Sequence, residues 1–293
     1  MDDILVKIKR FYVQGSMSTK LIFINVAVFL GMRLFFVAAT LFGAGDGDFL
    51  GYLQMPSSPE RFIYRPWTIL TYMFLHVDFL HILFNMLWLY WFGNIFLRFF
   101  SGRHLGGIYV LGGIAGALMF MAAYNIFPYF RDPVRQDNLL MGASASVMAI
   151  VFAVSFYRKD YEINLLIVGR IKLVYLALFV LLIDLLSVTS ENAGGHIAHL
   201  GGALFGIFFT LRFRRGTDLT AAINRMIDRA VNLFKRKPHM KVTYKRAETD
   251  MEYNARKRDE MEKLDAILDK LKRSGYESLS AEEKKTLFNA SRR

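Results

Sequence analysis

Long apolar runs separated by short polar segments occupy the first 213 residues of this 293-residue chain. A helix needs about 20 mostly apolar residues to cross the hydrocarbon core of a bilayer. Six segments approach that length, namely residues 21–43, 80–100, 105–127, 142–157, 171–188 and 195–213. The pattern therefore predicts an all-α polytopic membrane protein with a bundle of six transmembrane helices.

The fourth of these segments is the shortest and has the smallest side chains. Its small residues are Ala143, Ser144, Ala145, Ser146, Ala149, Ala153 and Ser155. A helix with few bulky side chains for lipid contact fits best at the centre of a bundle, where other helices enclose it. Two glycine pairs, Gly112 with Gly116 and Gly202 with Gly206, predict close helix contacts on the third and sixth spans.

The basic residues of the short connections predict the orientation of the spans. If the N-terminus is cytoplasmic, the inner side collects Lys7, Lys9, Arg10, Lys20, Arg98, Arg103, Arg158, Lys159, Arg170, Lys172 and Arg212. The outer connections then hold only Arg61, Arg65, Arg131 and Arg135. Because Lys and Arg favour the cytoplasmic side, we expect both termini in the cytoplasm. The long outer connection at 44–79 is rich in aromatic and apolar residues, which predicts a folded substructure at the interface.

Composition narrows the chemistry open to the chain. No cysteine is present, which excludes disulfides, a thiolate nucleophile and cysteine-bound metals. The net charge of +12 is concentrated after residue 213, where 21 Lys and Arg stand against 13 Asp and Glu. A basic tail that follows a membrane domain indicates contact with the lipid bilayer and its anionic headgroups before it indicates nucleic acid.

The charge and periodicity divide the chain into four parts. They are a cytoplasmic N-terminal segment at 1–17, the six-span domain at 18–213, a basic amphipathic helix with a linker at 214–258, and a small helical hairpin at 259–293. Gly275 is expected to end the first hairpin helix, and Ser280 with Glu283 is a capping-box signal for the second. The hairpin is either an appendage or a docking module, and its partner is unknown.

Four of the six histidines fall at one depth of the predicted bundle. His81 opens the second span, His196 and His199 open the sixth, and His76 lies just above the second. These spans run inward, as does the fourth, which has Ser144 in its first turn. At about 1.5 Å per residue, the group lies roughly 5–10 Å below the outer surface. Because ionisable groups in a membrane are costly and tend to mark function, this convergence indicates a site.

Ser144 and His199 are candidates for a nucleophile and its base. Alone, the serine could be a small residue at a helix contact, and the histidine could be a buried group bonded to a carbonyl. Together they form a pair in which imidazole takes the serine proton and returns it to the leaving amine. Gly142 and the helix N-terminus would offer N–H groups to an oxyanion. Ser146 points elsewhere on the helix and is assigned to packing.

Two further side chains could stabilise the oxyanion. His81 and Asn85 are four residues apart on the second span and share one face. A neutral imidazole and a carboxamide can both donate a hydrogen bond from that face. The alternative, a hydrogen bond between helices, stays open.

Other polar residues in the spans allow further interpretations. His196 and His199 could ligate a metal together with His76 and His81, but no HExxH motif, cysteine or adjacent carboxylate supports a metal site. Asp184 on the fifth span could orient a histidine or pair with Arg33 on the first. The sequence does not choose between these two pairings, and a structural or gating role is favoured over a catalytic one.

These residues resemble the rhomboid family of intramembrane serine proteases. The matching pieces are Pro66-Trp67, His76-Val-Asp-Phe-Leu-His81-Ile-Leu-Phe-Asn85, Gly142-Ala-Ser144 and Ala198-His199-Leu-Gly-Gly202-Ala-Leu-Phe-Gly206, spread over residues 18–213. Three positions depart from the family's common pattern, namely Thr68 after Trp67, Ala145 after the serine, and Met148 one turn below it.

The resemblance implies a six-span rhomboid-like bundle and an endopeptidase that cleaves transmembrane segments near the outer face. By it, Ser144 would be the nucleophile and His199 the base of a dyad that requires no acid. His81, Asn85 and the Ser144 N–H would stabilise the oxyanion, Gly202 would let the sixth span approach the fourth, and His76 would lie near the water-accessible mouth.

The resemblance also implies what surrounds the enzyme. No metal, nucleotide or other cofactor is needed. The partners would be single-span or multi-span membrane protein substrates and the lipid bilayer. The expected location is a bacterial inner (plasma) membrane, with both termini cytoplasmic.

Two other classes of protein remain as alternatives. The first is a catalytically silent rhomboid-like protein that binds membrane clients, although pure binding would require none of the four residues Ser144, His199, His81 and Asn85. The second is a transporter or metal-site protein, which would depend on His196 and an ion but not on Ser144.

Overall fold

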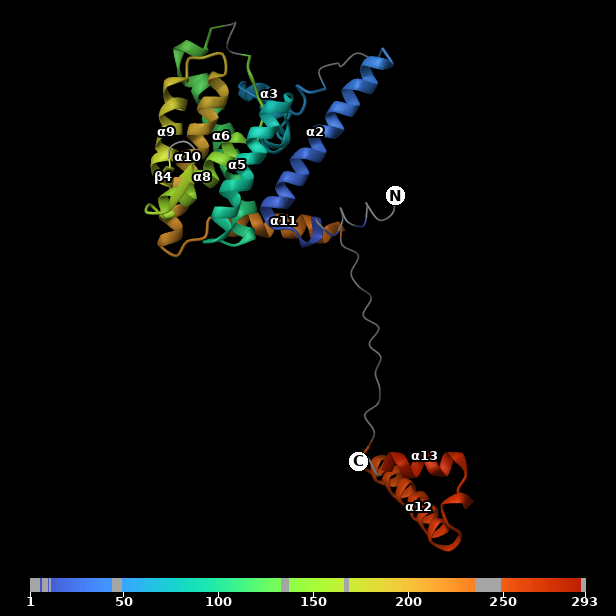
Figure 1. Ribbon diagram of the computed structural model, residues 1–293. Coiled ribbons are helices and arrows are strands. Elements are labelled where there is room, and N and C mark those ends of the chain that lie inside the picture. The colour runs from blue at the N-terminus through green and yellow to red at the C-terminus, as the bar shows by residue number, and fades with distance from the viewer. Residues whose placement is uncertain are drawn as a thin grey trace. The chain divides into compact units, whose positions relative to one another are not determined.

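The six predicted spans are all helical in the computed structural model, which describes residues 6, 10, 12–43, 49–132, 137–165, 169–234 and 249–290. The helices are α2 (Met17–Leu41), α5 (Phe79–Leu97), α6 (Gly102–Ile126), α8 (Ser144–Tyr157), α9 (Leu173–Leu186) and α10 (Ala193–Arg214) (Figure 1). By length and composition α2, α5, α6 and α10 could cross a membrane, whereas α8 and α9 are shorter apolar helices. The all-α polytopic fold predicted from the sequence is confirmed.

The start of the fifth span differs from the prediction. Ile171 and Lys172 belong to a strand, β4 (Gly169–Lys172), which pairs antiparallel with β3 (Glu162–Leu165). The helix α9 therefore begins only at Leu173. An apolar run fits a hairpin strand and a helix equally well, so hydropathy alone could not separate the two.

The helix α8 lies at the centre of the bundle, where α5, α6, α9 and α10 all contact it (Figure 1). All of its residues from Ala145 to Ser155 are buried. This agrees with the prediction that a short, small-sided helix is enclosed by the others. Ser146 is fully buried, and its Oγ lies 2.7 Å from where a Cβ on Gly113 would be, so it packs against α6.

Glycines let α6 and α10 approach α8 closely. A Cβ at Gly112 would lie 2.3 Å from the Ala149 Cβ, and one at Gly206 would lie 2.3 Å from the Ala149 carbonyl oxygen. Real Cβ atoms do not come this close to other heavy atoms, so only glycine fits. The close contacts predicted for both glycine pairs are therefore present, and they fix the relative positions of the three central helices.

The long outer connection contains short ordered elements, as predicted. They are β1 (Met55–Pro56), α3 (Pro59–Tyr64), α4 (Thr68–Thr71) and a 3₁₀ turn, η1 (Tyr72–Phe74). The strand β1 pairs antiparallel with β2 (Leu139–Leu140), the segment that leads into α8. The Trp67 indole N–H donates to the Tyr52 carbonyl at 2.8 Å and anchors α4 to the chain before it. The outer connection is thus attached to the start of α8.

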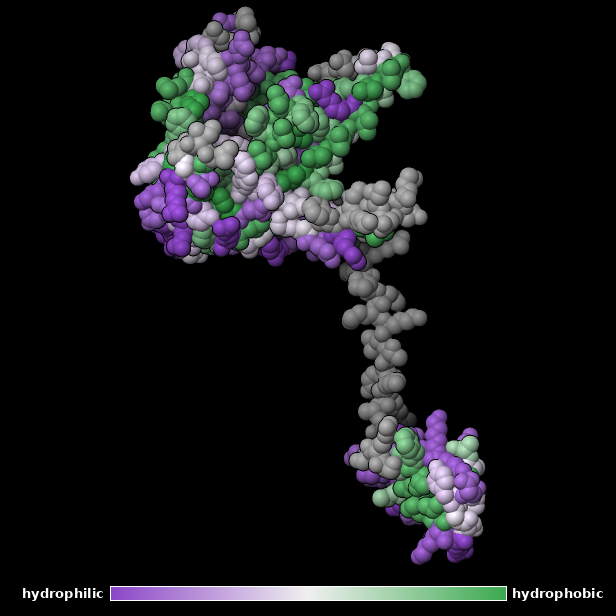
Figure 2. All heavy atoms as spheres, viewed as in Figure 1, coloured by the Kyte–Doolittle hydropathy of each residue, from purple (hydrophilic) through white to green (hydrophobic). Residues whose placement is uncertain are grey.

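The surface of the first unit, Met1–Lys235, has the polarity of a membrane protein. Figure 2 shows hydrophobic side chains along α2 and the flank of the bundle, and hydrophilic side chains gathered toward the two ends. The end formed by the C-termini of α8 and α10 carries Arg158, Lys159, Arg212, Arg214 and Arg215. An apolar band between polar ends is expected for a chain that spans a bilayer.

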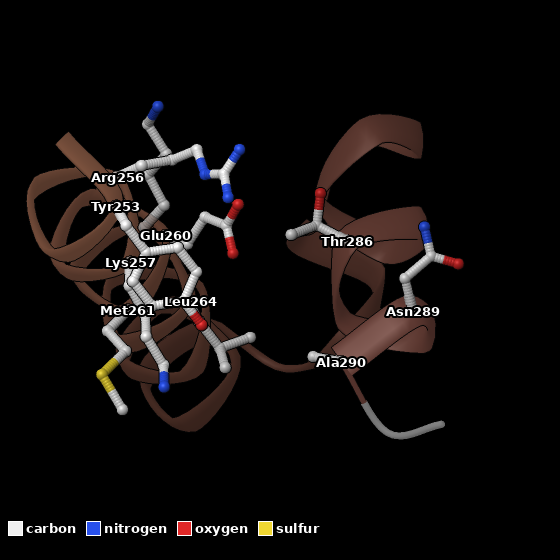
Figure 3. A pocket seen from close by; sticks show the side chains of 10 residues that line it. Tyr253, Arg256, Lys257, Glu260, Met261, Leu264, Thr286, Asn289 and Ala290 are labelled. Atoms are coloured by element: carbon white, nitrogen blue, oxygen red, sulfur yellow. The ribbon is translucent and has the colours of Figure 1, made fainter. Parts of the chain in front are cut away.

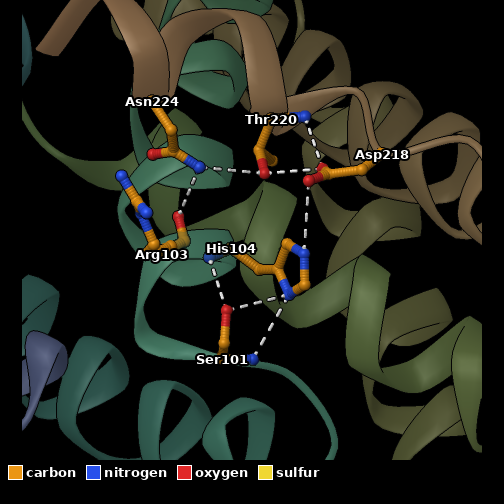
Figure 4. Close-up of polar contacts among 6 residues, drawn as sticks. All are labelled: Ser101, Arg103, His104, Asp218, Thr220 and Asn224. Atoms are coloured by element: carbon orange, nitrogen blue, oxygen red, sulfur yellow. Dashed lines mark hydrogen bonds and ion pairs between the residues drawn. The ribbon is translucent and has the colours of Figure 1, made fainter. Parts of the chain in front are cut away.

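A polar cluster attaches the helix α11 (Thr220–Phe234) to the N-terminal end of α6 (Figure 4). The Asp218 Oδ1 accepts hydrogen bonds from the N–H and hydroxyl of Thr220, at 2.8 and 2.7 Å. The Asp218 Oδ2 lies 3.4 Å from the Nε2 of His104, whose Nδ1 accepts from the Ser101 N–H. Because Asp218 caps the start of α11 and contacts α6, it links the two helices.

Acid is expected to loosen this link. Burial opposes ionisation of Asp218, but the two hydrogen bonds from Thr220 and the contact with His104 outweigh it and hold the pKa of this carboxyl below its usual value. A lowered pKa in the folded state stabilises above the ordinary aspartate pKa of about 4, and this stabilisation is lost as the pH falls through the lower, folded value. Amide hydrogen exchange in α11, corrected for intrinsic rates, should show protection falling across this window.

Asp218→Asn should remove the acid step and keep most of the helix stability, because an amide oxygen can still accept the hydrogen bonds of Thr220 and Asn caps a helix about as well as Asp. Asp160→Asn is the matched control, because the Asp160 side chain is 93% exposed and pairs only with Lys172 among the described residues. An unchanged acid step in Asp218→Asn would contradict the assignment.

The second unit, Arg236–Arg293, contains a helical hairpin. Its helices are α12 (Asp250–Ser274) and α13 (Ala281–Ala290), joined through Gly275 at φ +74° and the 3₁₀ turn η3 (Tyr276–Ser278). α12 begins at a Thr249–Glu252 capping box, N-terminal to the expected start at residue 259. The Ser280 N–H donates to Glu283 and the Glu283 N–H to Ser280, which is the predicted capping box of α13.

A pocket opens between the N-terminal half of α12 and the last turns of α13 (Figure 3). Its lining mixes apolar and charged residues, namely Tyr253, Arg256, Lys257, Glu260, Met261, Lys263, Leu264, Thr286, Asn289 and Ala290. The two helices pack closely only nearer to their connection, where Ile267 and Leu279 are buried.

Candidate active site

The N-terminus of α8 is shaped by the two residues before it. Gly142 has φ +118°, a conformation that side chains other than hydrogen rarely allow, and its N–H donates to the Tyr72 carbonyl at 2.9 Å. The Ala143 N–H donates to the Nε2 of His76 at 3.4 Å. Ser144 follows as the first helical residue and is only partly buried, unlike the eleven residues after it.

The imidazole of His81 lies over this turn. A Cβ on Gly142 would be 2.9 Å from both the Cε1 and the Nε2 of His81, and 3.8 Å from the Oγ of Ser144. Only a residue without a side chain therefore leaves room for His81 beside the serine. This arrangement agrees with the position expected for His81. The expectation that the Gly142 N–H faces an oxyanion is wrong, because this N–H is bonded to the Tyr72 carbonyl.

His76 is a neutral neighbour of the same turn. Its ring packs edge-on against His81, with centroids 5.0 Å apart. Burial, and next the charge of His81, lower the pKa of His76 to about 4, so its Nε2 is free to accept the Ala143 N–H. His76 thus holds the turn before Ser144, a role the sequence did not reveal.

Asn85 lies one turn below His81 on α5 and is buried. One N–H of its amide donates to the His81 carbonyl at 3.0 Å, within the same helix. The carboxamide has a second N–H, which this bond does not use. The sequence left open a hydrogen bond from Asn85 to another helix. The Asn85 hydrogen bond described here lies within α5 instead.

α10 brings His199 to the same end of α8. Gly202, one turn beyond His199, approaches the α8 backbone so closely that a Cβ would lie 2.1 Å from the Ala145 carbonyl oxygen. Since Ala145 follows Ser144, this contact sets the histidine and the serine on facing turns of the two helices.

Asp184 on α9 joins both histidines of α10. Its Oδ1 lies 2.8 Å from the Nδ1 of His196 and 2.8 Å from the Nδ1 of His199. The Arg33 guanidinium instead donates to the Val77 carbonyl. Of the two roles that the sequence allowed for Asp184, the structure forms the pairing with histidine.

The four outer histidines do not gather into one metal site. The ligand atoms of Asp184, His196 and His199 lie within 4.8 Å of one another and could hold an ion, whereas His76 and His81 form a separate pair. The Asp184 Oδ1 is already shared by both Nδ1 atoms. The arrangement therefore suits hydrogen bonding from two imidazoles to one carboxylate.

A profile of the rhomboid domain matches residues 64–216, slightly more than half of the chain. The chain belongs to the rhomboid family. The match covers α5 to α10 and every residue of the candidate site, so the family resemblance seen in the motifs is confirmed.

Two curated rhomboid relatives are similar to this chain. RHOMBOID-like protein 12, mitochondrial, of Arabidopsis thaliana is 30% identical over 162 residues, 52% of this chain and 48% of its own length. Rhomboid-related protein 1 of Caenorhabditis elegans is 29% identical over 176 residues, 52% of this chain and 43% of its own length. The chain thus spans less than half the length of either relative.

A second profile matches outside the rhomboid domain. It is described as a family of unknown function and covers residues 247–293. These residues contain the hairpin of α12 and α13. The hairpin is therefore matched by a family model separate from that of the rhomboid domain.

Proposed function

We propose that this protein is an intramembrane serine endopeptidase that cuts transmembrane segments of other membrane proteins near the outer face of the membrane. The observation that carries the proposal is the partly exposed Ser144 at the N-terminus of α8, beside His81 and facing the turn of α10 that bears His199. A serine used only for packing would need neither imidazole.

In this mechanism Ser144 Oγ attacks the carbonyl carbon of the scissile bond while His199 takes the hydroxyl proton. The tetrahedral intermediate carries a negative charge on the former carbonyl oxygen. The Ser144 N–H, His81 and the second amide N–H of Asn85 stabilise that charge, helped by the positive end of the α8 dipole. His199 then gives its proton to the leaving amine. Water then attacks the acyl-enzyme while His199 takes a proton from it. His199 gives that proton to the Ser144 oxygen, which leaves as the hydroxyl.

The substrate helix must unwind before the serine can reach its backbone. Amide groups freed in lipid are costly unless protein or water receives them. We propose that unwinding takes place beside α5 and α9 at the outer end of the bundle, with His76 near the water-accessible mouth. A single span with small or helix-weakening residues near its outer end suits this reaction.

The proposed location follows from charge. Basic residues concentrate at the end of the bundle opposite Ser144, and such residues favour the cytoplasmic side. Both termini are then cytoplasmic, the site faces outward, and we propose a bacterial inner (plasma) membrane. The apolar residues Met226, Ile227 and Val231 of α11 are exposed, and we propose that they rest on the inner lipid surface.

A fluorophosphonate probe on the purified full chain in liposomes tests the proposal. Wild-type protein should be labelled, and Ser144→Ala and His199→Ala should not be. Ser146→Ala is the matched control, because this serine faces Gly113 instead of the site and should leave labelling unchanged. Persistent labelling in Ser144→Ala, or an unlabelled wild type, would reject the proposal, and the second result would favour a silent rhomboid-like protein that binds clients.

A further inference from the structure

Asp184 is a buried carboxylate in the apolar helix α9, with 3% of its surface exposed. A charged group inside a membrane domain is costly unless hydrogen bonds compensate it, and such groups tend to serve a function. The function proposed above, with its dyad of Ser144 and His199, assigns Asp184 no role.

The hydrogen bonds of Asp184 are unevenly distributed. Both His196 and His199 approach Oδ1 through Nδ1, each at 2.8 Å. The other oxygen, Oδ2, is buried and has no hydrogen-bond partner among the described residues. Two imidazoles therefore hold the carboxylate by a single oxygen atom, and within the described part of the chain no arginine or lysine forms an ion pair with it.

This geometry determines which nitrogen of His199 carries the proton. An ionised carboxylate only accepts hydrogen bonds, so the Nδ1 of His199 must donate. In the neutral ring the lone pair then lies on Nε2, the nitrogen that remains to take a proton from serine. When Nε2 is protonated, the positive ring keeps its bond to the negative Asp184, which stabilises the ion pair formed during the reaction.

His196 is a second hydrogen-bond partner of the carboxylate. Its ring stands edge-on to that of His199, with centroids 5.9 Å apart, and both rings come from the first two turns of α10. Because His196 donates to the same Oδ1, it holds that atom toward α10. Replacing His196 would remove one hydrogen bond to Oδ1 and leave the carboxylate freer to rotate. The hydrogen bond between Asp184 and His199 would not be removed by the substitution itself.

We propose that Asp184 is a positioning residue that fixes the tautomer and ring orientation of His199, and that His196 holds Asp184 in place. The inference rests on the proposed function and extends its dyad to the sequence Ser144, His199, Asp184. The acid comes from α9, a different helix from those that bear the serine and the histidine.

The test compares Asp184→Asn with Asp184→Glu in liposomes that contain a single-span reporter substrate. Asparagine has the same size as aspartate and can still accept a hydrogen bond through its amide oxygen. It has no negative charge, and its amide N–H can face His199 in place of an oxygen. We expect kcat to fall on the order of 10²- to 10⁴-fold, with KM changed less than about threefold. Glutamate restores the carboxylate at the cost of one extra methylene, and it should recover part of kcat even though it packs less well.

A merely structural role predicts the opposite order. Asparagine would then support near-normal kcat, and glutamate would be the worse variant because of overpacking. His196→Gln should lower kcat by about tenfold or less. Glu191→Gln is the matched control, because this exposed acid precedes α10 and should leave kcat unchanged.

The outcomes separate this inference from the proposed function. If wild type cleaves, Ser144→Ala does not, and folded Asp184→Asn keeps wild-type kcat, positioning by Asp184 is rejected while the protease stands. If Ser144→Ala still cleaves, the proposed function fails first. If Asp184→Asn does not fold, Asp184→Glu is compared with the wild type, with kcat given per folded molecule. A folded Glu variant without activity overturns the proposal.

Discussion

Ser144→Ala and His199→Ala are each expected to lower kcat for a transmembrane reporter substrate by at least about 10³-fold, and the double variant should be no slower than the worse single variant. The reason is that the two residues act as one unit. Without the base the hydroxyl is a poor nucleophile, and without the hydroxyl the base has no proton to take.

Initial cleavage rates in liposomes, given per folded molecule, measure this dependence. His104→Gln is the control, because His104 lies at the other end of the bundle beside Ser101 and Asp218. Its rate should equal that of the wild type. Losses that multiply in the double variant would mean that Ser144 and His199 contribute independently, and the shared mechanism would have to be abandoned.

Gly202→Ala is expected to destabilise the bundle and to remove most activity. The added methyl would lie 2.1 Å from the Ala145 carbonyl oxygen and 2.9 Å from its carbon, which are backbone atoms and cannot rotate away. Overpacking of this kind costs about 1–3 kcal/mol or more. α10 must also move away from α8 and carry His199 with it, and a displacement of about 1 Å at a catalytic group can cost on the order of 10²-fold in rate.

Gly31→Ala provides the matched control for this substitution. Gly31 is also a helical glycine in an apolar span, α2, but a Cβ there would meet no atom within 4 Å. Thermal unfolding in detergent and the cleavage rate should therefore be unchanged in Gly31→Ala and reduced in Gly202→Ala. A wild-type midpoint and rate in Gly202→Ala would show that α8 and α10 do not need this close contact.

Features that depend on local sequence could be predicted. Six apolar runs gave six helices, because a span needs a minimum apolar length wherever it packs. The spacing of Gly202 and Gly206 predicted a close approach, because only glycine permits one. The Ser280–Glu283 capping box involves residues three apart and needs no knowledge of the remaining chain.

Features that depend on how distant segments meet could not be predicted. Asp184 precedes His199 by fifteen residues, and its partner is decided by how α9 packs on α10, so the sequence left Arg33 as an equal choice. The antiparallel pair of Met55 with Leu140 joins segments that hydropathy treats as unrelated loops. Likewise, only the folded turn brings His76 to the Ala143 N–H.

The enclosure of α8 has a consequence for biosynthesis. A helix of 14 residues with three serines is a weak signal for membrane insertion, and its buried face gains stability only when the flanking helices surround it. α10, the last helix of the bundle to be made, supplies both the contact at Gly202 and the imidazole of His199. Under the proposed mechanism, a nascent chain that has not yet assembled α10 lacks the base for Ser144 and could not cleave neighbouring proteins before the bundle is complete.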